Sequence, residues 1–240
     1  MNQNNAGFLS SIPPVTRNIL IINILVWFAQ FVLLRQGIDL SQYLGLHYFE
    51  SRHFGVHQLL TSMFLHDPSG IGHLFFNMFA VFMFGRVLES IWGPKRFLIY
   101  YLLAGIGAGI IQELSWVYDL REVIFNPDIQ TINLGTRIVA RQELFDMVTA
   151  IGASGAVFGI LVAFGMIFPN VQLMLIFPPI PIKAKWFVIG YGVMELFLGV
   201  GNFSGDSVAH FAHLGGLLTG LVILLYWKKK GTLYGNLRRY

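Results

Sequence analysis

One serine and one histidine in this chain stand in settings that suit a nucleophile and its base. Ser154 lies in the glycine-flanked segment 152–155, and His213 lies in the small-residue segment 212–216. A serine hydroxyl is a poor nucleophile until a neighbouring base takes its proton, and a neutral imidazole is the usual base near pH 7. The two residues therefore indicate nucleophilic catalysis, provided that the fold brings them together.

Further residues could support such a reaction. His73 and Asn77 are four residues apart and would share one face of a helix. Both side chains can donate hydrogen bonds to an oxyanion, and the backbone N–H of Ser154 near a helix start could add a third donor. Gly152, just before Ser154, and His210, three residues before His213, are candidates for supporting roles at the same site.

Each of these features also has an interpretation without chemistry. A serine between small residues in an apolar helix is more often a packing feature, and an asparagine can simply hydrogen-bond one helix to another. A buried histidine can be structural, although ionisable residues inside a membrane are commonly functional. Catalysis is favoured because the predicted membrane spans place Ser154, His213 and His73 at similar depths on the same side of the membrane.

The elements that must position these residues are apolar helices. The chain is 55% hydrophobic and 12% charged, whereas soluble domains carry about 25% charged residues. Apolar runs long enough to cross a hydrocarbon core of about 30 Å recur, and none alternates like a barrel strand. We therefore predict an all-α, polytopic membrane protein with a six-transmembrane-helix bundle, its spans being 18–34, 73–92, 97–114, 152–168, 186–200 and 209–227.

The basic residues predict the orientation of this bundle. Most of the 16 lysines and arginines fall on one side of the predicted spans, which is then the cytoplasmic side. We expect a short cytoplasmic tail over residues 1–17, the six-helix domain over 18–227 and a basic cytoplasmic tail over 228–240. The chain is then a multi-pass protein, and we expect it in a bacterial inner membrane with both termini cytoplasmic.

In this topology the second, fourth and sixth spans all begin at the outer face. His73, Ser154 and His213 then lie at similar depths, a few residues into their helices, at about 1.5 Å per residue. Glycines four apart let two helix backbones approach closely in a membrane. The fourth and sixth spans carry such pairs, Gly155 with Gly159 and Gly216 with Gly220.

Three connections lie on the outer side. Residues 36–72 and 115–151 are long, whereas residues 201–207 are short and rich in glycine and serine, which suits a mobile lid. Two acidic residues fall inside predicted spans, where a charge is costly. We expect Glu195 to face a partner or the gate, and Glu89 to anchor two helices by hydrogen bonds.

Together these segments resemble the rhomboid family of intramembrane serine proteases. The resemblance covers nearly the whole chain from about Leu59 to Gly220. It is carried by residues 60–66 with 73–77, by 152–155, and by 212–216 with Gly220; residues 84–89, 93–97 and 179–186 add to it.

The resemblance implies a serine endopeptidase that cuts membrane-anchored, single-span proteins within or beside their transmembrane segments in the lipid bilayer. Ser154 would be the nucleophile and His213 its partner, in a dyad without a catalytic acid. His73, Asn77 and the Ser154 amide would surround the oxyanion, and Phe158 would pack against the imidazole. No cofactor or metal is expected, and the scattered basic residues give no reason to expect nucleic acid. The oligomeric state stays open.

The chain departs from the family pattern at two places. His57-Gln58 stands where many members have Trp-Arg or Trp-Gln, and the 115–151 connection is longer than in a minimal rhomboid, so it could shape substrate access or carry a short amphipathic helix. One alternative is a catalytically silent rhomboid-like protein, which the retained Ser154 and His213 disfavour. Another is a haem or metal protein using His73 and His213 as ligands.

Overall fold

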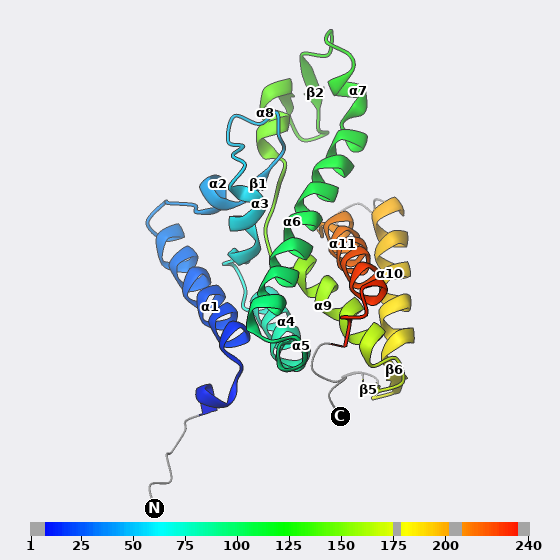
Figure 1. Ribbon diagram of the computed structural model, residues 1–240. Coiled ribbons are helices and arrows are strands. Elements are labelled where there is room, and N and C mark those ends of the chain that lie inside the picture. Colours follow the sequence, from blue (N-terminus) through cyan, green and yellow to red (C-terminus); the bar gives the residue numbers. More distant parts are fainter. Residues whose placement is uncertain (1–7, 175–178, 202–207, 235–240) are drawn as a thin grey trace, which may run out of the picture.

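The computed structural model describes residues 8–174, 179–201 and 208–234, and this part of the chain is mainly helical (Figure 1). Five helical stretches in it are long and apolar enough to cross a membrane: α1 (Pro14–Leu34), Gly72–Trp92, α6 (Pro94–Asp119), α10 (Ala184–Gly201) and α11 (His210–Lys229). The chain is thus an integral, multi-pass membrane protein, and the predicted all-α, polytopic fold is confirmed.

The stretch Gly72–Trp92 is one continuous rod made of three parts. It begins as α4 (Gly72–Ala80), passes through a π-helical turn η3 (Val81–Gly85) and continues as α5 (Arg86–Trp92). Gly93 then takes a φ of 79°, which a residue with a side chain adopts only at a steric penalty. Pro94 opens α6 directly after it, because a proline is well tolerated in the first turn of a helix.

The predicted fourth span is shorter than the others. It forms α9 (Ser154–Ile167), whose 14 residues extend about 21 Å, less than the thickness of a hydrocarbon core. Nearly all of its residues are buried, and it packs against α6, α10, α11 and η3. The helix therefore lies inside the bundle, and its first residue, Ser154, is held within the protein.

Small residues bring α9 and α11 into direct backbone contact. A methyl group at Gly216 would overlap the backbone of Gly155, and one at Gly220 would lie 3.1 Å from the Cα of Gly159. The predicted close approach of these two helices is confirmed. The sequence did not predict that α6 also packs at this contact, where its Ala108 faces Gly155 and its Ala104 faces Gly159.

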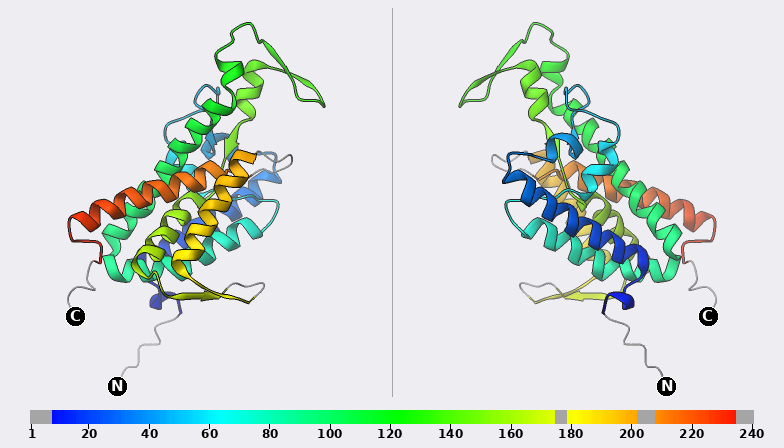
Figure 2. Two further views of the ribbon diagram at one scale, coloured as in Figure 1. Left: turned by 90° about the vertical axis from the view of Figure 1, so that its right-hand side faces the viewer. Right: turned by 90° about the vertical axis from the view of Figure 1, so that its left-hand side faces the viewer.

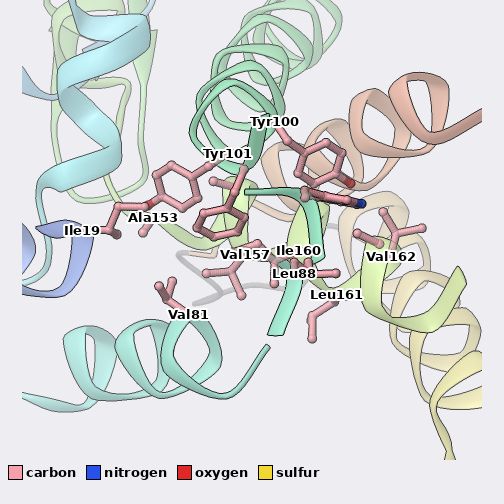
Figure 3. Packing of buried hydrophobic residues seen from close by; sticks show 14 of the residues in the cluster. Ile19, Val81, Leu88, Tyr100, Tyr101, Ala153, Val157, Ile160, Leu161 and Val162 are labelled. Carbon is pink, nitrogen blue, oxygen red and sulfur yellow. The ribbon is translucent and has the colours of Figure 1, made fainter. Parts of the chain in front are cut away.

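The apolar core lies where α9 meets α1, the Gly72–Trp92 rod and α6. Figure 3 shows its central side chains, among them Tyr101, Val157 and Leu88, which pack into one cluster. Many other large apolar side chains face outward instead, such as Leu25 at 62% and Phe28 at 57% exposed on α1. An apolar periphery of this kind suits a lipid environment.

A buried carboxylate joins α1 to the rod. Glu89 accepts hydrogen bonds from the backbone N–H groups of Val15 (2.9 Å) and Thr16 (2.7 Å) and from the Thr16 hydroxyl (2.7 Å). The first N–H groups of a helix lack partners within it, and the positive end of the helix dipole favours a negative charge there. The prediction that Glu89 anchors two helices is confirmed.

The start of α1 and the segment that follows α11 both contact the end of α5. The start of α1 is held by Glu89, and the Trp92 indole N–H donates to the carbonyl of Leu233, 2.8 Å away, beyond the end of α11. The outer connections lie at the opposite end of the bundle (Figure 2). The hairpin of β5 (Gln172–Met174) and β6 (Pro181–Lys183) is at the same end of the bundle as the start of α1.

The first outer connection is organised by one buried amide. It contains α2 (Ser41–Leu44), β1 (Leu46–His47), α3 (Gln58–Thr61) and η2 (Ser62–Phe64). A further short 3-10 helix, η1 (Phe8–Ser11), precedes α1. Gln58 is buried, while His57 is exposed. The Gln58 side chain accepts from the N–H groups of His47 and Gly55 and donates to the carbonyls of Tyr43 and His53.

The second outer connection forms a small lobe that extends beyond the helices (Figure 1). It comprises α7 (Arg121–Ile124), the hairpin of β2 (Thr131–Asn133) and β3 (Ile138–Ala140), and α8 (Arg141–Met147). Strand β4 (Thr149–Ala150) then pairs antiparallel with β1 and joins the two outer connections.

A carboxylate on α8 adds a second link between these connections. Asp146 accepts hydrogen bonds from Ser51 and from the backbone and guanidinium of Arg52. Burial alone would raise the pKa of Asp146, but the bonds from Arg52, Gln142 and Ser51 outweigh it and lower that pKa to about 2. The lobe is thereby tied to the first outer connection.

Parts of three predicted segments lie outside the described residues. These are residues 1–7 of the N-terminal tail, residues 235–240 of the C-terminal tail, and residues 202–207 of the expected lid. Of the lid, Gly201 is described, as the last residue of α10.

The contact of α9 with α11 generates a prediction on stability. Gly216→Ala should lower the thermal midpoint of the purified protein in detergent, because the added methyl must push α11 from α9; overpacking typically costs about 1–3 kcal/mol. The matched control is Gly190→Ala on α10, where a methyl would meet nothing within 4 Å. Equal midpoints for the two variants would contradict this role of Gly216.

Candidate active site

Ser154 is placed by an unusual backbone turn. Gly152 has a φ of 134°, and its N–H donates to the carbonyl of Ser62 at 2.9 Å. This conformation turns the chain from β4 into α9, so that Ser154 becomes the first residue of the helix. The Ser154 side chain is half-buried.

His213 lies on the first turns of α11, directly opposite Ser154. Its Nε2 is 2.8 Å from the Ser154 Oγ, which is hydrogen-bond distance. The glycine contact of α9 with α11 makes this separation possible, since a larger residue at Gly216 would hold the helices apart. The two residues with the strongest chemical signal in the sequence thus lie together.

An aromatic side chain fixes the plane of this imidazole. Phe158, one turn after Ser154, stacks on His213 with ring centroids 4.5 Å apart and planes 12° from parallel. Tyr191 of α10 packs against Phe158, with centroids 4.8 Å apart. Phe158 therefore lies where the family resemblance places it.

His73 lies on the other side of Ser154. Its Nδ1 is 3.3 Å from the backbone N–H of Asp67, which donates to it, so the ring proton belongs on Nε2. A methyl group at Gly152 would be 2.9 Å from His73 Nε2 and 3.6 Å from Ser154 Oγ. The space in front of Gly152 is thus bounded by a hydroxyl on one side and an imidazole N–H donor on the other.

Asn77 lies one turn further along α4. It is buried, and its Nδ2 donates to the carbonyl of His73 at 2.8 Å. An amide carries two N–H donors, so this bond uses one of them. The ring of His66 packs against His73 with centroids 4.9 Å apart and is fully buried.

A small cavity of about 40 Å³ adjoins Ser154. Its walls include Gln112 and Ala108 of α6 and the segment around Gly152. A water needs roughly 10–15 Å³ of such space, so the cavity can hold one. The Gln112 side chain accepts from the N–H of Ala212 at 3.0 Å, a contact for which the sequence offered no assignment.

A carboxylate meets His213 on the side away from Ser154. Glu195 of α10 is only 3% exposed, and its Oε2 lies 2.6 Å from His210 Nδ1 and 2.9 Å from His213 Nδ1. The family resemblance implies a dyad without a catalytic acid, and a carboxylate nevertheless lies at contact distance from His213. Glu195 and His213 belong to different helices, so residue spacing along one helix does not reveal their contact.

His210 also faces this carboxylate, and its position near the site agrees with the sequence interpretation. Among the described residues, the Glu195, His210 and His213 ligand atoms lie within 4.8 Å of one another, a donor set able to hold a metal ion. His73 is not a member of that group.

The comparison with known families decides the identity of this arrangement. The family model of the rhomboid domain matches residues 53–230. This chain belongs to the rhomboid family. The family resemblance of the sequence is confirmed, and it covers both Ser154 and His213.

This rhomboid is similar to several curated proteins. It is 29% identical to RHOMBOID-like protein 12, mitochondrial, of Arabidopsis thaliana over 67% of this chain and 43% of that protein. It is 27% identical to rhomboid protease AarA of Providencia stuartii over 68% of this chain and 52% of that protein. It is 28% identical to rhomboid protease GluP of Bacillus subtilis over 68% of this chain and 24% of that protein. The chain thus spans about half the length of these relatives or less.

Proposed function

We propose that this rhomboid is an intramembrane serine endopeptidase. It would hydrolyse peptide bonds within or next to the transmembrane segments of membrane-anchored, single-span proteins. The observation that carries the proposal is the 2.8 Å contact between Ser154 Oγ and His213 Nε2, in a half-buried position beside a donor from His73. The bacterial relatives named as rhomboid proteases support it.

The reaction would proceed through an acyl-enzyme. His213 Nε2 takes the Ser154 proton while Oγ bonds to the scissile carbonyl carbon, and the carbonyl oxygen becomes an oxyanion. The protonated His213 then gives its proton to the leaving amine as the C–N bond breaks. A water attacks the resulting ester with His213 again as base, which releases the acid product and restores the Ser154 hydroxyl.

The oxyanion would lie in the space in front of Gly152. His73 Nε2–H borders that space and would donate to the negative charge together with the Ser154 backbone N–H, and the remaining N–H of Asn77 would add a third bond. Phe158 would keep the His213 ring in the plane that serves both proton transfers. Gly152 would be needed because any side chain there would fill the oxyanion space.

The location of the chain ends supports a cytoplasmic position for both termini. Residues that follow α11, together with Lys95 and Arg96 at the start of α6, gather at the end of the bundle opposite the outer connections. Basic residues concentrate on the cytoplasmic side of membrane proteins. We place the short tail 1–17 and the basic tail 228–240 on that side, in a bacterial inner membrane.

The central test compares the wild type with Ser154→Ala and His213→Ala. Purified protein in detergent is incubated with a panel of single-span substrates, and a fluorophosphonate probe reports on the serine. Each variant should lose cleavage, because the two residues act as a unit, and Ser154→Ala should also lose labelling. The matched control is Ser90→Ala on α5, an exposed serine whose hydroxyl donates to the carbonyl of Arg86 in the same helix.

The outcomes separate the competing interpretations. Cleavage retained by Ser154→Ala would show that the nucleophile lies elsewhere. A folded wild type that neither cleaves any substrate nor reacts with the probe would identify a catalytically silent rhomboid that binds clients without cutting them.

A second prediction concerns the oxyanion. Asn77→Ala should lower kcat by about 10²- to 10³-fold and leave KM nearly unchanged, because an oxyanion donor acts in the transition state. The matched control is Asn23→Ala on α1. Asn23 is also buried and makes the same type of bond, donating to the carbonyl of Ile19 four residues earlier at 2.7 Å. An equal loss of kcat in both variants would assign Asn77 to helix stability.

A further inference from the structure

We infer that Glu195 is a positioning residue of the catalytic unit, which thereby becomes a Ser154–His213–Glu195 triad. Its carboxylate would hold the proton of His213 on Nδ1 and leave Nε2 free to accept the Ser154 proton. This inference rests on the proposed function and extends it by one residue that the dyad does not contain.

The first argument is the tautomer that the chemistry requires. A neutral imidazole carries one ring proton, and the Ser154 hydroxyl can donate only to a ring nitrogen that lacks it. Because Ser154 Oγ lies 2.8 Å from Nε2, the His213 proton must be on Nδ1 for catalysis. Glu195 Oε2, 2.9 Å from Nδ1, is an acceptor placed to select that tautomer.

The second argument is the absence of a competing acceptor. Within the described ranges, His213 Nδ1 is buried and makes no well-aligned hydrogen bond, and the Glu195 oxygen is at contact distance but off the ideal direction. Catalytic hydrogen bonds in enzymes without substrate are often poorly aligned and tighten when substrate binds. A buried N–H donor without an acceptor would be unfavourable, so the carboxylate is its natural partner.

The third argument is charge. When His213 takes the Ser154 proton it becomes an imidazolium inside a site that is largely shielded from water. A buried carboxylate 2.9 Å from Nδ1 stabilises that cation far more than solvent-exposed groups would, because charges interact strongly at low dielectric. In the Ser-His-Asp template the acid has the same two roles, orientation of the ring and stabilisation of the imidazolium.

The position of Glu195 in the fold also calls for an explanation. Apart from Ala184 it is the only buried residue among those described on α10, and a carboxylate inside a spanning helix is costly unless paired. His210 Nδ1, 2.6 Å from the same Oε2, supplies a second partner. Two imidazoles thus converge on one oxygen, with His210 fixing the carboxylate that meets His213.

The competing interpretation is that Glu195 only attaches α10 to α11. Glu195→Gln separates the two, because the amide keeps the shape and one acceptor oxygen but loses the charge. We expect kcat to fall by about 10²- to 10⁴-fold, as when the triad acid is replaced by its amide, with KM within about twofold. The rate of Ser154 labelling by a fluorophosphonate should fall in parallel, and Glu195→Asp should recover part of it.

The matched control is Glu89→Gln. Glu89 is likewise a buried carboxylate on a spanning helix with several hydrogen bonds, but its partners belong to the start of α1. This variant should lower the thermal midpoint and leave kcat of the folded protein unchanged. Loss of thermal stability in Glu195→Gln with unchanged kcat and labelling would overturn the inference.

A readout without substrate keeps this test distinct from that of the proposed function. Nitrogen-15 NMR of the histidine side chains in detergent micelles, with the His213 signal assigned from its loss in His213→Ala, reports the tautomer directly. The wild type should show His213 protonated on Nδ1, and Glu195→Gln should show a larger Nε2-protonated fraction. An Nε2-protonated His213 in the wild type would refute the inference even in an active protease.

The converse result is also informative. An Nδ1-protonated His213 that depends on Glu195, in a protein that cleaves and labels nothing, would preserve the positioning role and refute the protease. A metal ion that copurifies in stoichiometric amount, and whose removal by a chelator abolishes activity, would show instead that Glu195, His210 and His213 are ligands and would overturn the triad.

Discussion

The site depends on one steric constraint, the contact of α9 with α11 at glycine. Helices in lipid gain little from the hydrophobic effect when they associate, so close packing and polar contacts must hold them together. Gly216 allows the α11 backbone to reach that of Gly155, and Ala108 of α6 closes the same space from the third side. Only at this spacing does Ser154 come within 2.8 Å of His213. Glycine and alanine residues without reactive groups therefore determine the distance between Ser154 and His213.

The second constraint is that buried polar groups in an apolar fold need partners. The Tyr100 hydroxyl donates to the carbonyl of Gly159, and Glu89 satisfies the N–H groups at the start of α1. Glu195 obeys the same rule, but its partners are imidazoles, whose protonation state changes during acyl transfer. A carboxylate that meets backbone N–H groups stabilises a fixed structure, whereas one that meets an imidazole can also influence a reaction. The chemical nature of the partner thus distinguishes the structural role of Glu89 from the role proposed for Glu195.

Local patterns in the sequence were sufficient to predict the helices, the close approach of α9 and α11, and the face shared by His73 and Asn77, because each depends on spacing within one helix. They could not predict contacts that arise only when helices cross. Glu195 and His213 are in different helices whose relative rotation is fixed by packing. The same holds for Gln58, whose four hydrogen-bond partners lie in other parts of the first outer connection, and for the start of α9, which Gly152 sets through its bond to Ser62.

The proposed triad gives the site opposite electrostatic ends. Proton transfer from Ser154 to His213 separates charge, with the anion moving to the substrate oxygen and the cation remaining on the imidazole. In the proposed mechanism, donors from His73 and the Ser154 backbone would face the anionic end, and the Glu195 carboxylate would face the cationic end. Fixed dipoles and charges arranged in this way require little reorganisation as charge develops, and at low dielectric they act strongly. A dyad alone would leave the cationic end without a counter-charge. In this bundle the counter-charge is the Glu195 carboxylate of α10, which has the fewest buried residues among the long helices described.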